Sequence, residues 1–247
     1  MTTQQMLSGL RRGITKYKMI KDGDKIAVGV SGGKDSVCLL KLLAEYRRFS
    51  PERFELIAIT VDLNFSSGNA DFTPIKALCE ELNVEYVIEK TDIGQIVFDV
   101  RKESNPCALC SKMRKGALYN KAKELGCNKV ALGHHADDLV DTMFLSLFYE
   151  GRLSTFAPKS YLDRTDLTLI RPLIAVQEID VISYAKTLPT VKSCCPANKE
   201  TRREYVKDLI RHIGKDIPNV RDMAYAALTH PERYNLFDRF EREVDDF

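Results

Sequence analysis

The chain has 247 residues, of which 44% are hydrophobic and 29% charged, and its net charge is only +2. This is the composition of an ordinary globular protein that needs no disulfide bonds to hold its core, and the charge does not by itself indicate a nucleic-acid partner. No apolar run reaches the roughly 20 residues of a membrane-spanning helix, and the N-terminus lacks the apolar stretch of a secretory signal. We therefore expect no membrane partner and a cytoplasmic location, where cysteines stay reduced.

Short apolar segments alternate with helical segments along the chain. The pattern predicts strands at 25–30, 54–61, 84–88, 129–132 and 167–170, and helices at 35–47, 73–82, 113–125, 137–149, 177–186 and 201–212. Such alternation is typical of a parallel sheet, here of about five strands, with helices on both faces. We expect one α/β domain over residues 1–247, with a short helical segment at 1–20 and a helical C-terminal region at about 177–247.

The first predicted strand runs directly into Ser31-Gly32-Gly33-Lys34-Asp35-Ser36. Two glycines let the backbone approach a ligand closely, and the N-terminus of the next helix favours an anion at the same point. The serine hydroxyls and the Lys34 cation add to this, so the segment predicts a pyrophosphate-binding loop. Its spacing differs from that of a Walker A loop and of a dinucleotide fingerprint. The alternative is a plain glycine turn, with Asp35 or Ser36 as helix cap.

The cysteines predict a metal site. Cys107 and Cys110 form a C-x-x-C pair just before a predicted helix, and a third thiol is available in the Cys194-Cys195 segment. A structural zinc ion takes four ligands, and no fourth is evident. Three cysteines on an iron–sulfur cluster, which normally takes four, would leave one iron open and so would suggest chemistry at that iron. A redox pair remains an alternative. The other cysteines are expected in the core: Cys38, Cys79 and Cys127.

A second polar loop, Gly133-His134-His135-Ala136-Asp137-Asp138, follows the fourth predicted strand. The carboxyl ends of parallel strands meet at one edge of a sheet, so we expect this loop near the glycine loop. Paired imidazoles and carboxylates suit metal binding or proton transfer. The alternative is that Asp137 only caps the following helix.

The segment SGGKDS resembles the loop of the pyrophosphate-loop (PP-loop) ATPases, which split ATP between its α and β phosphates. The wider resemblance is to tRNA 2-thiocytidine synthetases. It rests on CALCSKMRKGALY, VALGHHADDLVDTMFLSLFYEGRLSTFAPK, IRP, REYVKDLIR and NLFD, which occur in that order between residues 25 and 238. That family has an adenine-nucleotide hydrolase-like fold and forms homodimers. It adenylates the C2 oxygen of a cytidine in the tRNA anticodon loop and replaces it with sulfur, which implies ATP, Mg²⁺ and a [4Fe–4S] cluster as cofactors.

The resemblance also implies roles for individual residues. The residues expected to bind ATP are Ser31, Gly32, Gly33, Asp35 (through Mg²⁺), Ser36, Val61, Asp62, Gly133 and His134. Those expected at the reacting groups are Lys34, Arg114, Asp137 and Asp138. The expected cluster ligands are Cys107, Cys110 and Cys195, although many relatives have P-C-x-x-C where this chain has Cys194-Cys195-Pro196.

Several alternatives remain at this level. A related uridine-thiolating enzyme of the T-loop kind would carry extra zinc-binding cysteine pairs near its termini, which this chain lacks. A lysidine-forming enzyme would need no cysteine cluster, and a zinc-dependent RNA-binding module would need a fourth ligand. A non-catalytic nucleotide-binding or redox-sensing protein would not need the Asp137-Asp138 pair. The expected partners are tRNA, contacted through the basic segments 11–18, 112–115 and 202–211, and a sulfur donor, either a persulfide carrier or inorganic sulfide.

Overall fold

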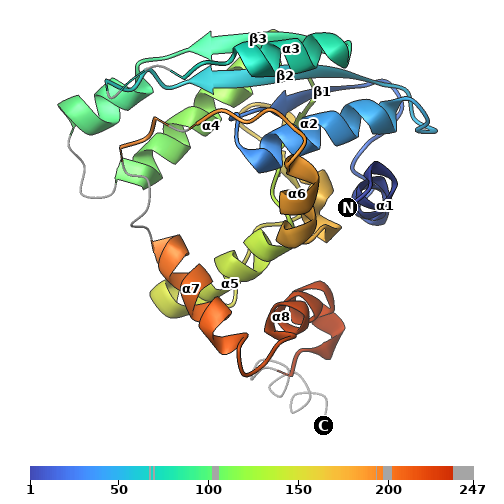
Figure 1. The fold of residues 1–247 in the computed structure, drawn as a ribbon, viewed down its shortest axis with the longest axis vertical. Coiled ribbons are helices and arrows are strands. Elements are labelled where there is room, and N and C mark those ends of the chain that lie inside the picture. The colour runs from blue at the N-terminus through green and yellow to red at the C-terminus, as the bar shows by residue number, and fades with distance from the viewer. Residues whose placement is uncertain (67, 69, 102–105, 193, 197–201, 236–247) are drawn as a thin grey trace. The chain divides into compact units, whose positions relative to one another are not determined.

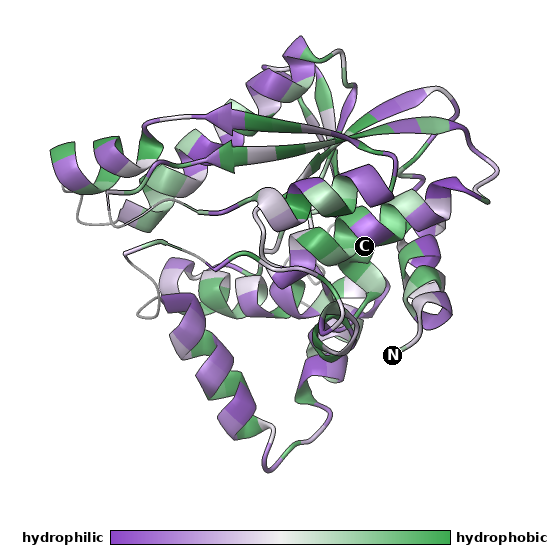
Figure 2. Cartoon of the chain, turned by 45° about the horizontal axis from the view of Figure 1, so that its top comes forward, coloured by the Kyte–Doolittle hydropathy of each residue, from purple (hydrophilic) through white to green (hydrophobic). Residues whose placement is uncertain are grey.

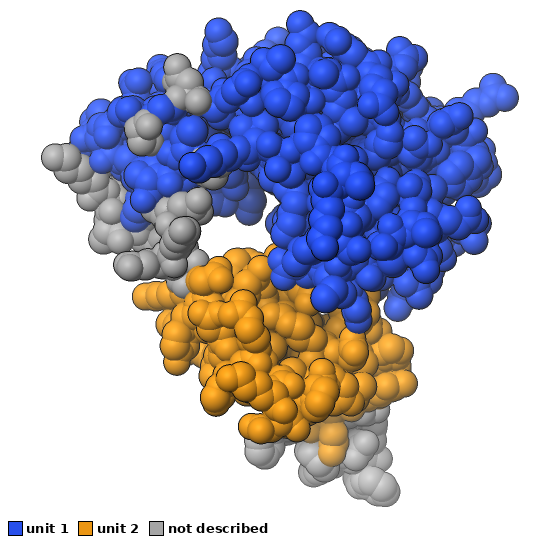
Figure 3. All heavy atoms as spheres, viewed as in Figure 1, with its two compact units in different colours: residues 1–136, 157–200 blue, residues 137–156, 201–247 orange. Residues whose placement is uncertain are grey.

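The computed structural model describes residues 1–66, 68, 70–101, 106–192, 194–196 and 202–235, so the final letters of the NLFD motif lie outside the described residues. The chain divides into two compact units (Figure 3). The first comprises Met1–Ala136 and Ala157–Glu200, and the second Asp137–Phe156 and Thr201–Phe247. A single domain over the whole chain stays a prediction.

The first unit is built on a six-stranded sheet (Figure 1) with the order β3-β2-β1-β4-β6-β5. The strands are β1 (Asp24–Gly29), β2 (Phe54–Asp62), β3 (Glu85–Lys90), β4 (Lys129–Ala131), β5 (Lys159–Leu162) and β6 (Leu167–Ile170). Neighbouring strands pair in parallel, except that β5 runs antiparallel to β6. The predicted parallel sheet is confirmed, and the count of about five strands is corrected to six.

Helices cover both faces of this sheet, as predicted. They are α1 (Thr3–Lys16), α2 (Lys34–Arg47), α3 (Thr73–Glu81), α4 (Pro106–Glu124) and α6 (Glu178–Ala185), with a π-helical turn at Gln95–Val100 and a 3₁₀ turn at Pro172–Ala175. On β2, Ile57 and Ile59 pack in one cluster with Leu118 of α4. Phe54, also on β2, has its ring centroid 6.2 Å from that of Tyr46 on α2. Side chains of odd and even positions point to opposite faces of a strand, so α4 and α2 cover opposite faces.

The core of the first unit follows the central strands. Ala27 and Val28 of β1 are fully buried, as is the apolar side of α2 at Leu39 and Leu43. In Figure 2 hydrophobic residues run along the long strands, while the helices carry both hydrophobic and hydrophilic residues. This is the pattern expected of strands covered on both faces and helices covered on one.

A buried ion pair lies where β1 and β4 begin. Lys129 Nζ donates hydrogen bonds to Asp24 Oδ2 at 2.5 Å and to the Met19 carbonyl at 2.8 Å. Both charged side chains are almost entirely buried, with 6% and 5% of their surface exposed. Asp24 also accepts from the amide of Asn128. The pair therefore joins the first residues of two neighbouring strands.

Helix α4 begins earlier than predicted. The sequence pattern predicted a start at Met113, with the C-x-x-C pair before the helix, whereas the helix begins at Pro106. Proline suits the first position of a helix because its missing N–H would have no partner within the helix there. Cys107 and Cys110 therefore lie on the first turns of α4, at a spacing of three residues that places both on one side of the helix.

The second unit is helical. Its helices are α5 (Ala136–Glu150, whose first residue belongs to the first unit), α7 (Arg202–Ile213) and α8 (Val220–Thr229), with a 3₁₀ turn at Pro231–Arg233. Val140 of α5 and Val206 and Ile210 of α7 form its buried core, against which Val220 and Tyr225 of α8 pack. This confirms the helical C-terminal part. No helix in the described ranges is both long and apolar enough to cross a membrane.

Candidate active site

The strand order of the sheet reverses beside β1. From β1 the chain builds outward through β2 and β3 on one side, and then through β4 and β6 on the other. Loops that leave the carboxyl ends of the two strands at such a switch point form a crevice, which is where ligands bind in open α/β sheets. The glycine loop 31–36 follows β1 and the histidine loop 133–135 follows β4, so the two loops predicted from the sequence lie side by side.

The glycine loop is organised by its own serines. Ser31 N donates to Ser36 Oγ at 3.1 Å, and Ser36 Oγ donates to the Gly33 carbonyl at 2.9 Å. Helix α2 starts at Lys34 with Gly33 as its N-cap, and no side chain in the described part of the chain caps it. The alternative in which Asp35 or Ser36 caps the helix is therefore wrong. A helix N-terminus without a side-chain cap is suited to an anion.

Gly133 brings the second loop against the first. A Cβ atom at Gly133 would lie 2.8 Å from the carbonyl carbon and oxygen of Asp35 and 3.0 Å from Ser36 N. Only a residue without a side chain allows the backbone at the start of α2 to approach so closely. Gly133, expected to bind ATP, thus has a packing role that the structure makes explicit.

Four charged or ionisable side chains gather at the first turn of α2. Lys34 Nζ lies 2.6 Å from Asp35 Oδ1 and 3.0 Å from Glu178 Oε1, and His135 Nε2 lies 3.7 Å from Asp35 Oδ1. Burial alone would lower the pKa of Lys34, but the hydrogen bonds and charges of Asp35 and Glu178 outweigh it and raise the pKa. Lys34 is therefore a fixed cation beside the loop. Glu178 was not predicted from the sequence, because its partner lies 144 residues earlier in the chain.

Arg171 is a second residue that the sequence analysis did not assign. It follows β6, and its Nε donates to His134 Nδ1 at 3.3 Å while its Nη1 donates to the Ala157 carbonyl at 2.5 Å. Burial lowers the pKa of Arg171. Because His134 Nδ1 accepts a hydrogen bond, its Nε2 carries the proton in the neutral ring. The signal was available in the IRP motif, which stands at the carboxyl end of a predicted strand.

At the end of β2, the predicted adenine contact has a defined backbone. The Asp62 carbonyl accepts from Thr91 N at 3.0 Å and from Thr91 Oγ1 at 2.8 Å, and Asp62 Oδ1 accepts from Asn64 N at 3.2 Å. Val61 packs against the clusters beneath α4. A contact of Val61 and Asp62 with the adenine stays a prediction.

Two of the cysteines expected to bind a cluster lie on α4 and the third lies in the segment after α6, all in the first unit. Burial raises the pKa of Cys110, the Arg114 cation lowers it, and the charges of Cys195 and Cys107 raise it again. The Cys194 Sγ lies 3.9 Å from the Lys192 carbonyl.

The donor chemistry of these cysteines fits an iron–sulfur cluster, because cysteine thiolates are the usual ligands of such clusters. Among the residues that the structure describes, no three His, Cys, Asp or Glu side chains converge closely enough to hold one metal ion. The prediction that the remaining cysteines are core residues is confirmed, since all three are buried: Cys38, Cys79 and Cys127.

The acidic residues after the histidine loop belong to the second unit, where arginines hold them. Arg203 Nη1 lies 3.3 Å from Asp138 Oδ1, and Arg221 Nη1 lies 3.4 Å from Asp137 Oδ1 and 3.0 Å from Asp141 Oδ1. Asp141 is fully buried; burial raises its pKa, and the Arg221 cation opposes the rise. Asp137 and Asp141 stand one helical turn apart, so one arginine restrains both.

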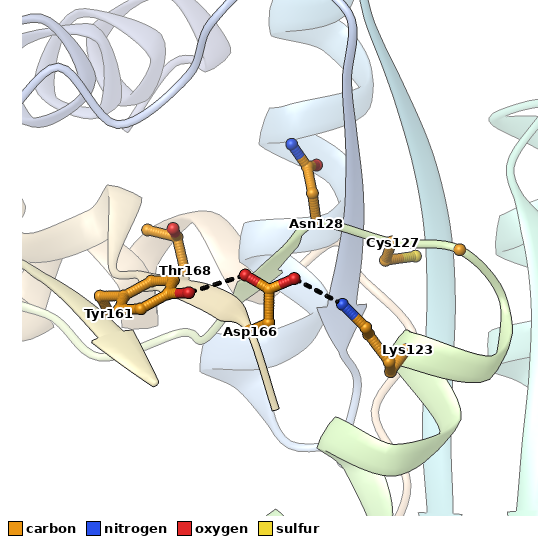
Figure 4. Close-up of a pocket in the computed structure, with 7 residues that line it drawn as sticks. Lys123, Cys127, Asn128, Tyr161, Asp166 and Thr168 are labelled. Atoms are coloured by element: carbon orange, nitrogen blue, oxygen red, sulfur yellow. Dashed lines mark hydrogen bonds and ion pairs between the residues drawn. The ribbon is translucent and has the colours of Figure 1, made fainter. Parts of the chain in front are cut away.

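A separate pocket of about 390 Å³ lies at the opposite, amino-terminal end of β4 and β6 (Figure 4). Its lining includes Asp166, which accepts hydrogen bonds from Lys123 at 2.9 Å and from Tyr161 at 2.7 Å. None of the site residues predicted from the sequence lines it. Its charged groups satisfy one another, and we assign it no part in the chemistry.

Comparison with known proteins relates this geometry to a family. The model of the PP-loop domain matches residues 6–214. The chain is 41% identical to a tRNA-cytidine(32) 2-sulfurtransferase of Syntrophotalea carbinolica, over 92% of this chain and 89% of the relative. It is 35% identical to the tRNA-cytidine(32) 2-sulfurtransferase of Geobacter metallireducens, over 96% of this chain and 93% of the relative.

Among solved structures, the chain is similar to the U34-tRNA thiolase NcsA from Methanococcus maripaludis, which was solved with its [4Fe–4S] cluster. The two superpose with a TM-score of 0.74 at 26% identity, over 94% of this chain and 79% of that one. An NAD⁺ synthetase of Burkholderia pseudomallei, at 13% identity and a TM-score of 0.50, shares the fold.

Proposed function

Because the chain belongs to the PP-loop domain family and, within it, to the tRNA-cytidine(32) 2-sulfurtransferases, we propose that it is an ATP-dependent tRNA thiolase that converts a cytidine of the anticodon loop to 2-thiocytidine. The observation that carries the proposal is that Cys107, Cys110 and Cys195 belong to the same unit as the glycine loop at the N-terminus of α2. A nucleotide-binding or redox-sensing protein would have no use for both features together.

The phosphate loop binds ATP in this proposal. The N–H groups at the start of α2 and the hydroxyls of Ser31 and Ser36 take the phosphates, and Asp35 binds the accompanying Mg²⁺. Lys34, which Asp35 and Glu178 hold at the loop, offsets negative charge as the phosphate bond breaks. Gly32 and Gly33 let the phosphates approach the backbone, while Gly133 and His134 line the neighbouring loop.

The reaction has two steps that balance in atoms and charge. The C2 oxygen of the cytidine attacks the α phosphate of ATP, the bond between the α and β phosphates breaks, and pyrophosphate leaves. Sulfur at the oxidation level of sulfide then attacks C2 as HS⁻, the bond between C2 and its oxygen breaks, AMP leaves with that oxygen, and the added sulfur loses its proton. A ring oxygen is a poor leaving group until it is esterified in this way. Asp137 and Asp138 serve the reacting groups, and Arg221 and Arg203 hold these carboxylates in place.

Cys107, Cys110 and Cys195 hold a [4Fe–4S] cluster in this proposal. Three protein ligands on four irons leave one iron open, and when bound the cluster supplies that iron as a carrier for sulfur. The Arg114 cation beside Cys110 favours the thiolate form of the ligands and offsets charge near the reacting groups. The sulfur itself comes from inorganic sulfide, or from a persulfide carrier whose outer sulfur is first reduced to the sulfide level by two electrons from thiols, which become a disulfide.

The remaining partners are also proposals. The substrate is tRNA, and the basic helix α7 of the second unit, with Arg202, Lys207 and Arg211, is a candidate for contact with its phosphates. We further propose that the enzyme is a cytoplasmic homodimer.

The test is thiolation of a defined tRNA. Protein purified without oxygen is assayed for iron and sulfide, and then incubated with ATP, Mg²⁺, sulfide and a tRNA transcript with cytidine at position 32. Nucleosides are then analysed by mass spectrometry. We expect 2-thiocytidine only when ATP is present, and none when the transcript carries uridine at that position.

The adjacent cysteines provide a matched control. Cys195→Ala should lose the cluster and thiolation but keep ATP binding, whereas Cys194→Ala should keep all three. The opposite result would make Cys194 the third ligand. If the wild-type protein instead forms 2-thiouridine in the anticodon loop, the related uridine-thiolating activity replaces the proposed one; the similarity to the U34-tRNA thiolase makes this the alternative to test.

A further inference from the structure

The phosphate loop and the segment that carries Cys195 touch at Gly32. Val191 N donates a hydrogen bond to the Gly32 carbonyl at 2.9 Å. A Cβ atom on Gly32 would lie 2.7 Å from Val191 Cβ and 3.1 Å from its Cγ2, so the valine side chain occupies the space that a side chain on residue 32 would need. Gly32 also has a φ of +83°, which glycine adopts without strain. Val191 therefore holds Gly32 through both its backbone and its side chain.

This contact fixes a donor of the phosphate loop. The Gly32 carbonyl and the Gly33 N–H belong to one planar trans peptide, so they point in opposite directions. When Val191 N binds the carbonyl, it sets the direction of the Gly33 N–H. In the structure the Gly33 N–H donates to Ser31 Oγ at 3.4 Å. An anion that accepted this N–H in place of the hydroxyl would polarise the same peptide and strengthen the bond from Val191. The two hydrogen bonds therefore reinforce each other.

Val191 is also close in sequence to one of the expected cluster ligands. Cys195 is four residues further along, and four residues span at most about 14 Å. In Figure 1 this segment, drawn in orange, runs from α6 toward α4. Cys195 and the C-x-x-C pair on α4 belong to the same unit.

The other cysteine-bearing element contacts the same strand. A Cβ atom on Gly29, the last residue of β1, would lie 2.9 Å from Leu118 Cδ2 of α4. Helix α4, which carries Cys107 and Cys110, thus packs on β1 two residues before the phosphate loop begins. The two cysteine-bearing segments, α4 and the segment after α6, therefore contact β1 and its loop at glycines.

We propose that Val191 is a positioning residue that couples nucleotide binding in the phosphate loop to the cysteine ligand set. The coupling rests on the proposed function, because it needs both ATP and the cluster as ligands. The coupling is reciprocal: if the cluster raises the affinity for ATP by some factor, ATP must raise the affinity for the cluster by the same factor. Couplings of this kind typically change affinity by about 5- to 150-fold.

The experiment measures both directions of the coupling in the full chain. Affinity for a non-hydrolysable ATP analogue is measured on protein with its cluster and on protein stripped of iron. The rate of iron loss to a chelator is followed by visible absorbance with and without the analogue. For the wild type we expect the cluster to raise nucleotide affinity about fivefold or more, and the analogue to slow iron loss.

Three variants separate positioning from general destabilisation. Val191→Gly removes the side chain over Gly32 and makes the segment from residue 191 to Cys195 more flexible. Two ratios should then come close to one: the ratio of nucleotide affinities with and without the cluster, and the ratio of iron-loss rates with and without the analogue. Iron and nucleotide should each still bind. Val191→Thr keeps the branched shape and should keep the wild-type ratios. Thr190→Gly, at the exposed neighbouring position, adds the same backbone freedom without the contact and should also keep them.

The outcomes are distinct. Wild-type ratios in Val191→Gly, or equal loss of coupling in Thr190→Gly, would overturn the role of Val191. Wild-type protein that binds iron and nucleotide independently would overturn the coupling and leave the proposed function intact. Wild-type protein that binds no iron under strict exclusion of oxygen would overturn both.

Discussion

Replacing Gly133 with alanine should disturb the phosphate loop although no residue of that loop is mutated. The new methyl group would lie 2.8 Å from the carbonyl carbon and oxygen of Asp35. Carbon atoms settle at about 3.5 Å or more, so the loops would have to separate by about 0.7 Å. The atoms opposite are backbone at the first turn of α2, which cannot rotate away. Overpacking of this kind costs about 1–3 kcal/mol.

The assay combines stability and binding. Urea unfolding followed by circular dichroism gives the free energy of unfolding, and calorimetry gives the affinity for a non-hydrolysable ATP analogue. For Gly133→Ala we expect the free energy of unfolding to fall by about 1–3 kcal/mol. Nucleotide affinity should fall roughly tenfold or more, because small displacements of binding groups are costly at such sites.

The matched control is Gly116→Ala on α4. No described atom outside the local helix backbone lies within 4 Å of the position that its Cβ would take. Alanine in a helix interior should then stabilise the protein by about 0.5–1 kcal/mol and leave nucleotide affinity unchanged. If Gly133→Ala were as stable as the wild type and bound the analogue equally well, the packing of the histidine loop on α2 would not position the phosphate loop.

Three further predictions follow from other buried groups. Lys129→Met should lower the free energy of unfolding by about 3–5 kcal/mol, because it leaves a carboxylate buried without its cation; a loss below about 1 kcal/mol in urea unfolding would contradict this. Asp141→Asn should lower the rate of thiolation at saturating ATP and Mg²⁺, since Arg221 would then pair more fully with Asp137; an unchanged rate would argue against it. Burial raises the pKa of Cys38 to about 12, so iodoacetamide at pH 8 should leave this thiol unmodified in the folded protein, as peptide mass spectrometry would show, and label it once urea unfolds the chain.

The central sheet was predictable because its signal is local. Strands buried on both faces must be continuous apolar runs, so β2 and β6 could be located from a few neighbouring residues, and β6 was predicted with the bounds that the structure has. The phosphate loop was equally accessible, since the glycines, the serines and the strand before them are contiguous. Edge strand β5 has no such signal: its four residues are half-buried or exposed and show no apolar run.

The contacts that fix the site were not accessible in the same way. Glu178 meets Lys34 across 144 residues, and nothing in either local sequence identifies the other. Arg171 is intermediate, because its position after a predicted strand marked it as near the site but did not reveal its hydrogen bond to His134. Sequence patterns report how a residue fits its own helix or strand, whereas ion pairs across the fold depend on which elements become neighbours.

The motif GHHADD shows this limit most clearly. It reads as one catalytic loop, yet the structure divides it: Gly133 to Ala136 belong to the sheet unit, and the two carboxylates belong to the helical unit. Arg203, 65 residues beyond Asp138, and Arg221, 80 residues beyond Asp141, hold the acidic side chains. The geometry of these carboxylates therefore depends on α7 and α8 packing against α5 around Val206 and Ile210. A substitution in that small core should then alter the acidic residues while leaving the phosphate loop, which the first unit builds by itself, able to bind nucleotide.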